Sequence, residues 1–109
     1  MKTFELDDGA ITCVLGETAK ENWSIIDNSE GDFTWMHLNS FPSGHIIIQS
    51  EEINNNILFN AANLCRQNTK YRNIPHLKVC YTKVSNLRKG EKPGSVHYVS
   101  NRQVKTITL

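Results

Sequence analysis

The sequence predicts an α+β domain with a mixed, mainly antiparallel sheet, one long helix and one short helix. This prediction rests on short β-branched runs between turn residues, on two stretches with helical spacing, and on connections that mostly have hairpin length. The 109 residues match the common size of one domain, so residues 1–109 are expected to form a single unit.

Short strands are expected throughout the chain. In order they are residues 3–6, 10–15, 33–38, 45–49, 78–82, 96–99 and 104–109. The first two are expected to join at Asp7-Asp8-Gly9, because Asp-Gly is a strong hairpin signal. The last two are expected to pair with each other around Ser100-Asn101-Arg102.

Two helices are expected between these strands. Thr18 can cap a short helix over residues 19–23, with Glu21 completing a capping box. Ser50 is expected to cap the long helix, whose apolar positions recur with helical spacing. Those positions are Ile53, Ile57, Leu58, Ala61, Ala62, Leu64 and Cys65; Glu51 and Glu52 fall in the expected first turn, and Arg66 and Lys70 near the expected end.

The charge distribution is strongly asymmetric. Residues 1–52 carry ten acidic side chains against Lys2 and Lys20, a net charge of −8. Residues 53–109 carry ten basic side chains against Glu91, a net charge of +9. Such asymmetry indicates a nucleic-acid partner or an anionic surface, and the alternative is a domain whose two halves form opposite, salt-bridged faces.

Several classes of protein are disfavoured by the sequence. No apolar run approaches the length of about 18 residues that spans a membrane, and the acidic N-terminus does not resemble a signal peptide, so a cytoplasmic protein without membrane contact is expected. Cys13, Cys65 and Cys80 lie in separate apolar runs, which favours buried free thiols. No cofactor or metal motif is present, so none is expected.

A basic, Gly/Pro-punctuated loop over residues 86–94 is the first candidate site. Glycine lets the backbone approach a phosphate closely, and exposed cations gain affinity for nucleic acid by releasing counterions. The alternative is a solvated charge run. The candidate nucleic-acid contacts in the basic half are Arg88, Lys89, Lys92, Lys83, Lys78 and Arg102.

A second candidate site combines Asp32, Trp35, His37 and His45. Trp35 and His37 fall on one face of a strand, where they could stack bases or contact phosphate, or form part of the core. An enzyme that uses the two histidines as general acid and base, with Asp32 orienting one of them, is an alternative.

The chain resembles the NFACT-R domain, the RNA-binding domain of the NFACT family, over nearly its whole length. The segments that carry the resemblance are residues 14–22, Asp32-Phe33-Thr34-Trp35-Met36-His37, Pro42-Ser43-Gly44-His45-Ile46-Ile47-Ile48, Tyr81-Thr82, Ser85-Asn86-Leu87-Arg88-Lys89 and Lys92-Pro93-Gly94. The resemblance implies that Asp32, Trp35, His37 and His45 are signature positions and that Arg88, Lys89 and Lys92 contact nucleic acid.

The resemblance also implies a role in translation. Large NFACT proteins act on stalled ribosomal subunits in ribosome-associated quality control and help to recruit tRNA. This chain matches none of their other domains and is expected to be a stand-alone form. The leading hypothesis is therefore a module that binds structured RNA, either tRNA or rRNA, with DNA and a ribosomal subunit as further candidate partners. A nucleic-acid-processing enzyme and a protein-interaction adaptor are the alternatives.

Overall fold

A six-stranded antiparallel sheet forms the centre of the computed structural model, which describes all 109 residues. In chain order the elements are β1 (Lys2–Leu6), β2 (Ile11–Leu15), α1 (Ala19–Asp27), β3 (Thr34–Leu38), β4 (Ile46–Ile48), α2 (Asn55–Gln67), β5 (Lys78–Lys83), β6 (Leu87–Lys89), β7 (Val96–Tyr98) and β8 (Lys105–Thr108), with 3₁₀ turns η1 (Val84–Asn86) and η2 (Asn101–Gln103). The α+β class is confirmed.

The strand order in the main sheet is β1-β2-β4-β3-β5-β8, and β6 and β7 form a separate two-stranded sheet. Every pairing is antiparallel, so the sheet is not mixed. Strand β3 is central: its Trp35 lies opposite Ile47 of β4 on one side and opposite Thr82 of β5 on the other.

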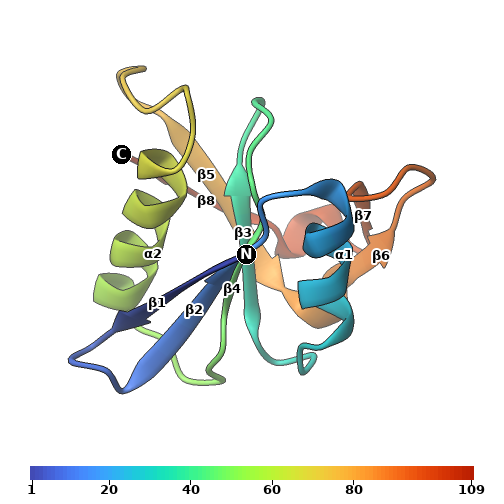
Figure 1. Cartoon of the computed structure of the whole chain (residues 1–109), viewed down its shortest axis with the longest axis horizontal. Coiled ribbons are helices and arrows are strands. Elements are labelled where there is room, and N and C mark those ends of the chain that lie inside the picture. Colours follow the sequence, from blue (N-terminus) through green and yellow to red (C-terminus); the bar gives the residue numbers. More distant parts are fainter.

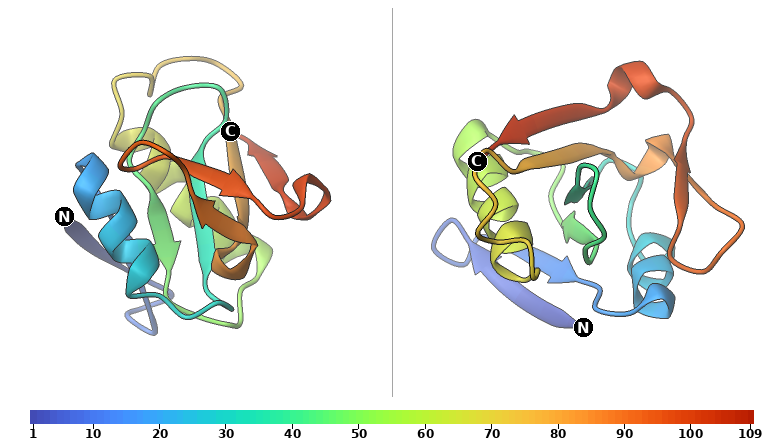
Figure 2. Two further views of the ribbon diagram at one scale, coloured as in Figure 1. Left: turned by 90° about the vertical axis from the view of Figure 1, so that its right-hand side faces the viewer. Right: turned by 90° about the horizontal axis from the view of Figure 1, so that it is seen from above.

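The two faces of the main sheet are covered by different elements (Figure 1, Figure 2). Helix α2 packs on one face and closes the larger hydrophobic cluster, to which β3 contributes Met36 and Leu38. Helix α1 and the β6–β7 hairpin cover the other face, where Trp35 belongs to a smaller cluster. Successive strand residues point to opposite faces, so β3 and β5 contribute to both clusters.

The predicted N-terminal hairpin is confirmed. Lys2 of β1 lies opposite Leu15 of β2, and Leu6 lies opposite Ile11. The connecting Asp7, Asp8 and Gly9 all have positive φ, at 54°, 55° and 87°. Aspartate and glycine tolerate this left-handed backbone better than most residues, which explains why the turn forms here.

Helix α1 has the predicted cap but extends to Asp27 rather than ending at Trp23. The Thr18 hydroxyl accepts a hydrogen bond from the Glu21 amide at 3.1 Å, and the Glu21 carboxylate accepts one from the Glu17 amide at 3.0 Å. The extra turn buries Ile25 against the sheet. Tertiary packing therefore lengthens a helix that local signals alone make short.

The predicted start of the long helix was wrong. Helix α2 begins at Asn55, and the N-cap is Asn54, whose side-chain oxygen accepts a hydrogen bond from the Ile57 amide at 2.9 Å. Ser50 instead forms a local turn, in which its hydroxyl bonds both the amide and the carbonyl of Glu52. The prediction failed because serine favours such turns as readily as helix caps. Lys70 also lies beyond the helix, which ends at Gln67.

The predicted pairing of the last two strands was also wrong. Strand β7 pairs with β6, and β8 pairs with β5 at the edge of the main sheet. The buried Asn86 explains the difference, because its side chain accepts from the Ser100 amide at 2.8 Å and donates to the Ser100 carbonyl at 2.9 Å. These bonds hold the end of the hairpin, and η2 then redirects the chain onto β5.

Neither helix has the length and apolar character needed to cross a bilayer.

Candidate nucleic-acid interface

Four aromatic rings form a compact cluster on the hairpin side of the main sheet. The rings of Trp35 and His37 are stacked, with centroids 5.8 Å apart and an interplanar angle of 4°. His45 meets both rings edge-on, at 5.4 Å from Trp35 and 5.1 Å from His37. Tyr98 of β7 closes the cluster at 5.8 Å from Trp35.

Strand geometry brings these rings together. Trp35 and His37 are two residues apart on β3 and so share a face, while His45 immediately precedes β4, the neighbouring strand. The His45 backbone is fixed by the buried Asn22 of α1, whose side-chain oxygen accepts from the His45 amide at 3.1 Å. The prediction that Trp35 and His37 share a face is confirmed.

Two of the four rings are buried and incompletely hydrogen-bonded, whereas His37 and Tyr98 are partly exposed. Trp35 is 1% exposed and His45 is 4% exposed. The Trp35 Nε1 and the His45 Nδ1 have no hydrogen-bond partner in the protein. Buried polar atoms are almost always paired with protein or water, so two unpaired ring nitrogens in one cluster indicate capacity for a ligand or for ordered water.

Both histidines are uncharged at neutral pH. Burial lowers the pKa of His45 to about 3, and the neighbouring His37 adds to the effect. Burial also lowers the pKa of His37, against a hydrogen bond from its Nδ1 to the Leu38 carbonyl at 2.6 Å. Because a carbonyl only accepts, this bond places the proton on Nδ1 and leaves Nε2 as an acceptor. The cluster can therefore form directional hydrogen bonds but supplies no positive charge.

The end of the predicted basic loop meets the ring cluster, so the two candidate sites are neighbours on the β6–β7 hairpin. Gly94, Ser95 and Val96 line a cavity of about 220 Å³ together with Trp35, His37, His45 and Tyr98. An engineered protein cavity of about 150 Å³ can hold benzene, so this space can hold a planar ring or several waters.

Contacts with α1 hold this loop in place. The indole Nε1 of Trp23 donates to the Ser95 carbonyl at 2.8 Å, and the same carbonyl accepts from the Gly90 amide at 2.8 Å. Gly94 has φ +85°, and a Cβ there would lie 2.9 Å from the Cα of Ala19. Glycine is therefore required at residue 94 both for the backbone conformation and for the close approach to α1.

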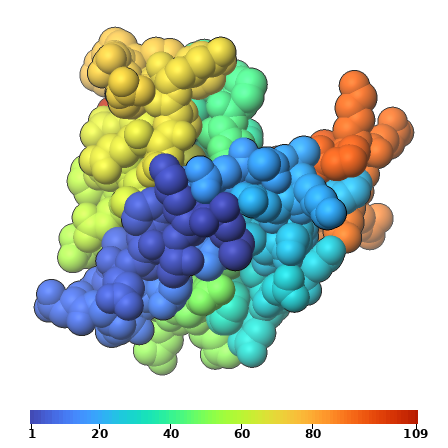
Figure 3. All heavy atoms as spheres, in the orientation of Figure 1, coloured from blue at the N-terminus to red at the C-terminus, as the bar shows by residue number.

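Three of the six predicted cations lie on the hairpin, which protrudes from the body of the molecule (orange in Figure 3). Arg88, Lys89 and Lys92 are all exposed. The Lys89 ammonium lies 2.7 Å from Asp27 Oδ2 and 5.3 Å from the centre of the Trp23 ring. Arg88 and Lys92 form no ion pair, so they are the freer charges on this surface.

The other three predicted cations lie elsewhere. Lys78 and Lys83 are at opposite ends of β5, about 16 Å apart at the usual rise per strand residue. Arg102 lies in η2, between β7 and β8. Lys83 and Arg102 line a different cavity, on the α2 side, which shares no residue with the cavity beneath the loop.

Asp32 does not join the histidines. It precedes β3, whereas His37 lies near the other end of that strand. The Asp32 carbonyl accepts from the Lys83 ammonium at 2.8 Å. The structure therefore brings together three of the four signature residues, Trp35, His37 and His45, but not the fourth. No group of three or more His, Cys, Asp or Glu side chains is arranged to hold a metal ion.

Sequence reasoning missed Tyr98 as part of this site, and it placed Asn86 in the basic loop without assigning it a role. Tyr98 completes the ring cluster, and its hydroxyl lies 3.6 Å from the Cys80 sulfur. Asn86 fixes the end of the hairpin. The alternation of Val96 and Tyr98 could have placed Tyr98 on the inward face, but the assumed pairing of the last two strands concealed its partner. No local pattern in the basic loop indicated that the Asn86 side chain is buried and bonds to Ser100.

The fold has a counterpart among solved structures. The C-terminal part of the fibronectin/fibrinogen-binding protein from Streptococcus suis superposes with a TM-score of 0.88 at 22% identity, over 98% of this chain and 44% of that one. At this identity the likeness concerns the fold alone.

The sequence is also similar to that of Rqc2 homolog RqcH from Bacillus subtilis (strain 168). The two are 28% identical over 107 residues, which is 95% of this chain and 19% of that protein. The chain therefore spans about a fifth of the length of this relative. The family model for the NFACT protein RNA binding domain matches residues 2–102, and the chain belongs to this family.

Proposed function

We propose that this domain binds structured RNA, either tRNA or rRNA, in the cytoplasm through the β6–β7 hairpin and the ring cluster beneath it. The observation that carries the proposal is that Gly94 and Ser95 of the hairpin line one cavity with the ring cluster. In that cluster Trp35 and His45 each have a buried ring nitrogen without a hydrogen-bond partner. Membership of an RNA-binding family and similarity to Rqc2 homolog RqcH support a link to ribosome quality control.

The two parts of the surface would contribute differently to binding. Arg88 and Lys92 are exposed cations without ion-pair partners, and they would contact phosphates with little dependence on base sequence. The neutral rings beneath would accept or donate hydrogen bonds to a base or sugar that enters the cavity. The first contribution sets affinity, whereas the second favours RNA that can present an unstacked nucleotide.

The first test is binding of fluorescent tRNA, duplex DNA and a random single strand at two salt concentrations. We expect binding that favours tRNA and weakens steeply with salt. Arg88→Gln with Lys92→Gln should reduce the slope of log K against log[salt] by roughly 0.7–0.9 for each phosphate that the variant no longer neutralises. Lys70→Gln with Arg72→Gln is the matched control, because it removes the same two charges at exposed residues outside the hairpin. Affinity that does not respond to salt contradicts the proposal.

A binding role without turnover is part of the proposal. Burial lowers the pKa of both histidines, so neither is the imidazolium that a general acid would require at pH 7. Asp32 does not orient either of them, because its carbonyl accepts from Lys83. Turnover of labelled RNA that disappears in His37→Ala would favour the nucleic-acid-processing alternative. Absence of binding to tRNA, DNA and the single strand would instead favour the adaptor alternative.

A further inference from the structure

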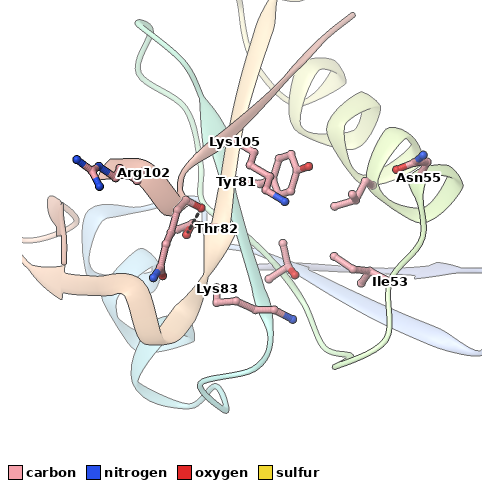
Figure 4. Close-up of a pocket in the computed structure, with 10 residues that line it drawn as sticks. Ile53, Asn55, Tyr81, Thr82, Lys83, Arg102 and Lys105 are labelled. Atoms are coloured by element: carbon pink, nitrogen blue, oxygen red, sulfur yellow. Dashed lines mark hydrogen bonds between the residues drawn. The ribbon is translucent and has the colours of Figure 1, made fainter. Parts of the chain in front are cut away.

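A cavity on the other side of the main sheet has the chemistry of an anion site. It has a volume of about 560 Å³ and lies between the C-terminal end of β5, the start of β8 and the start of α2 (Figure 4). It is lined by Thr34, Ile53, Asn55, Leu58, Tyr81, Thr82, Lys83, Arg102, Gln103 and Lys105. Three of these side chains are cationic and none is acidic.

The cations have distinct positions around the cavity. Lys83 and Lys105 extend from neighbouring strands toward the space beside α2, whereas Arg102 points away from the other residues, at the rim (Figure 4). The Lys83 ammonium donates to the Asp32 carbonyl at 2.8 Å and to the Glu51 carbonyl at 3.5 Å. Lys105 forms no hydrogen bond or ion pair with the protein. Lys83 is therefore fixed in place, and Lys105 is free to bind a ligand.

An unpaired buried hydroxyl is a second, independent sign of a ligand. Thr34 lines the cavity and is 1% exposed, and its Oγ1 has no hydrogen-bond partner. A hydroxyl buried in this way is unfavourable unless something bonds to it. Helix α2 adds its N-terminus, where Asn55 lines the cavity and the first turn carries no acidic residue to compete with an anion.

The remaining walls suit an organic group attached to the anion. Ile53 and Leu58 are apolar, and the Tyr81 ring lies beside Lys105 in the opening (Figure 4). The volume falls within the range of small-molecule sites, about 300–1,000 Å³. A phosphate would be held by Lys83, Lys105 and the Thr34 hydroxyl, while a planar base would pack against Tyr81.

From these observations we infer that the cavity beside α2 binds the phosphate group of a nucleotide, at a site separate from the hairpin surface. Two sources share this chemistry: a free nucleoside monophosphate and the phosphorylated end of an RNA strand. Nothing in the inference requires the hairpin to bind RNA, because the two cavities have no residue in common.

The test is calorimetric titration of the whole chain with adenosine monophosphate, with adenosine and with inorganic phosphate. We expect the monophosphate to bind roughly tenfold more tightly than adenosine, as for a hydrogen-bonded charge pair. Lys105→Gln should remove most of this preference, and Thr34→Val should weaken monophosphate binding by roughly fivefold. Lys70→Gln is the control for loss of one surface charge. Equal binding of adenosine and its monophosphate, or equal effects of Lys105→Gln and Lys70→Gln, would overturn the inference.

Thr34→Val gives a readout that a purely structural threonine would not give. Removal of an unpaired hydroxyl should raise the Tm of the ligand-free protein while lowering its affinity for the monophosphate. If both Tm and affinity are unchanged, Thr34 has no part in a phosphate site and the inference fails.

Short RNAs with a 5′-phosphate or a 5′-hydroxyl distinguish the two sources. Tighter binding of the phosphorylated RNA that is lost in Lys105→Gln supports an RNA end as the ligand. Equal binding of the two RNAs, together with monophosphate binding, supports a free nucleotide. Arg88→Gln with Lys92→Gln should leave monophosphate binding unchanged, so failure of the hairpin proposal and failure of this one give different results.

Discussion

The indole of Trp23 in α1 donates a hydrogen bond of 2.8 Å to the carbonyl of Ser95, which lies 72 residues later in the loop above the ring cluster. The same ring lies 5.3 Å from the Lys89 ammonium. A residue of the acidic N-terminal half, Trp23, thus holds the basic hairpin through a hydrogen bond and a cation–π contact. The order of the loop depends on a residue that is distant in sequence and is not itself expected to contact RNA.

Replacement of Trp23 by phenylalanine tests this support. The variant keeps an aromatic ring but loses the hydrogen bond, which should cost about 1 kcal/mol of stability. We expect faster amide hydrogen exchange at residues 90–95 and weaker RNA binding, because the loop must then be ordered on binding. Unchanged exchange in this loop would show that Trp23 does not hold it.

Removal of the Asp27 carboxylate should strengthen RNA binding. Asp27 lies 2.7 Å from the Lys89 ammonium and offsets its charge, so Asp27→Asn should free Lys89 for a phosphate and raise affinity at low salt. Folding stability should change by less than about 1 kcal/mol, because the pair is exposed. Glu30→Gln removes the same charge outside this pair and is the control. Equal gains in both variants would mean that only net charge matters.

Stability should fall as the pH falls below about 6.5, the pKa of an unperturbed histidine. The folded protein holds His45 neutral with a pKa of about 3, so the unfolded state binds more protons between these two values. Each pH unit costs about 1.4 kcal/mol for such a group, which gives about 2 kcal/mol between pH 6.5 and 5. Urea unfolding at these pH values measures the effect. His45→Gln should flatten the dependence, whereas the exposed His97→Gln should not.

The three thiols should be unreactive in the folded protein. Cys13, Cys65 and Cys80 are buried and free, as the sequence predicted. Burial raises the pKa of Cys13 and of Cys65 to about 12 and also raises that of Cys80, so little thiolate forms at pH 8. A disulfide reagent should label none of them before urea is added and all of them afterwards. Rapid labelling of Cys80 in the native state would indicate that the hairpin opens.

Local signals predicted the class of this fold but not its long-range pairings. The Asp7-Asp8-Gly9 turn and the Thr18 cap act within a few residues, and both were identified correctly. The partners of β7 and β8 depend on Asn86, whose bonds to Ser100 span 14 residues and carry no local signature. Alternation along β3 predicted the shared face of Trp35 and His37.

The closeness of the two candidate sites could not be predicted in the same way. The contact between the Gly94 turn and the rings depends on how α1 and the hairpin pack together. No local pattern of residues predicts how these two elements pack. For the same reason no pattern in the sequence indicated that Lys83 and Arg102 border a cavity on the opposite side of the sheet from Trp35.

Strand β5 carries residues of both sites on its alternating sides. Val79 joins the cluster under α2 and Lys83 lines the cavity beside it, while Cys80 joins the cluster under the hairpin. Deletion of a single residue within β5 would turn each following side chain to the opposite face and disable both sites together. Insertions in the exposed loop around Lys92 would not turn any side chain of β5 to the other face of the sheet. Over evolutionary time we therefore expect length variation to accumulate in that loop and to be absent from β5.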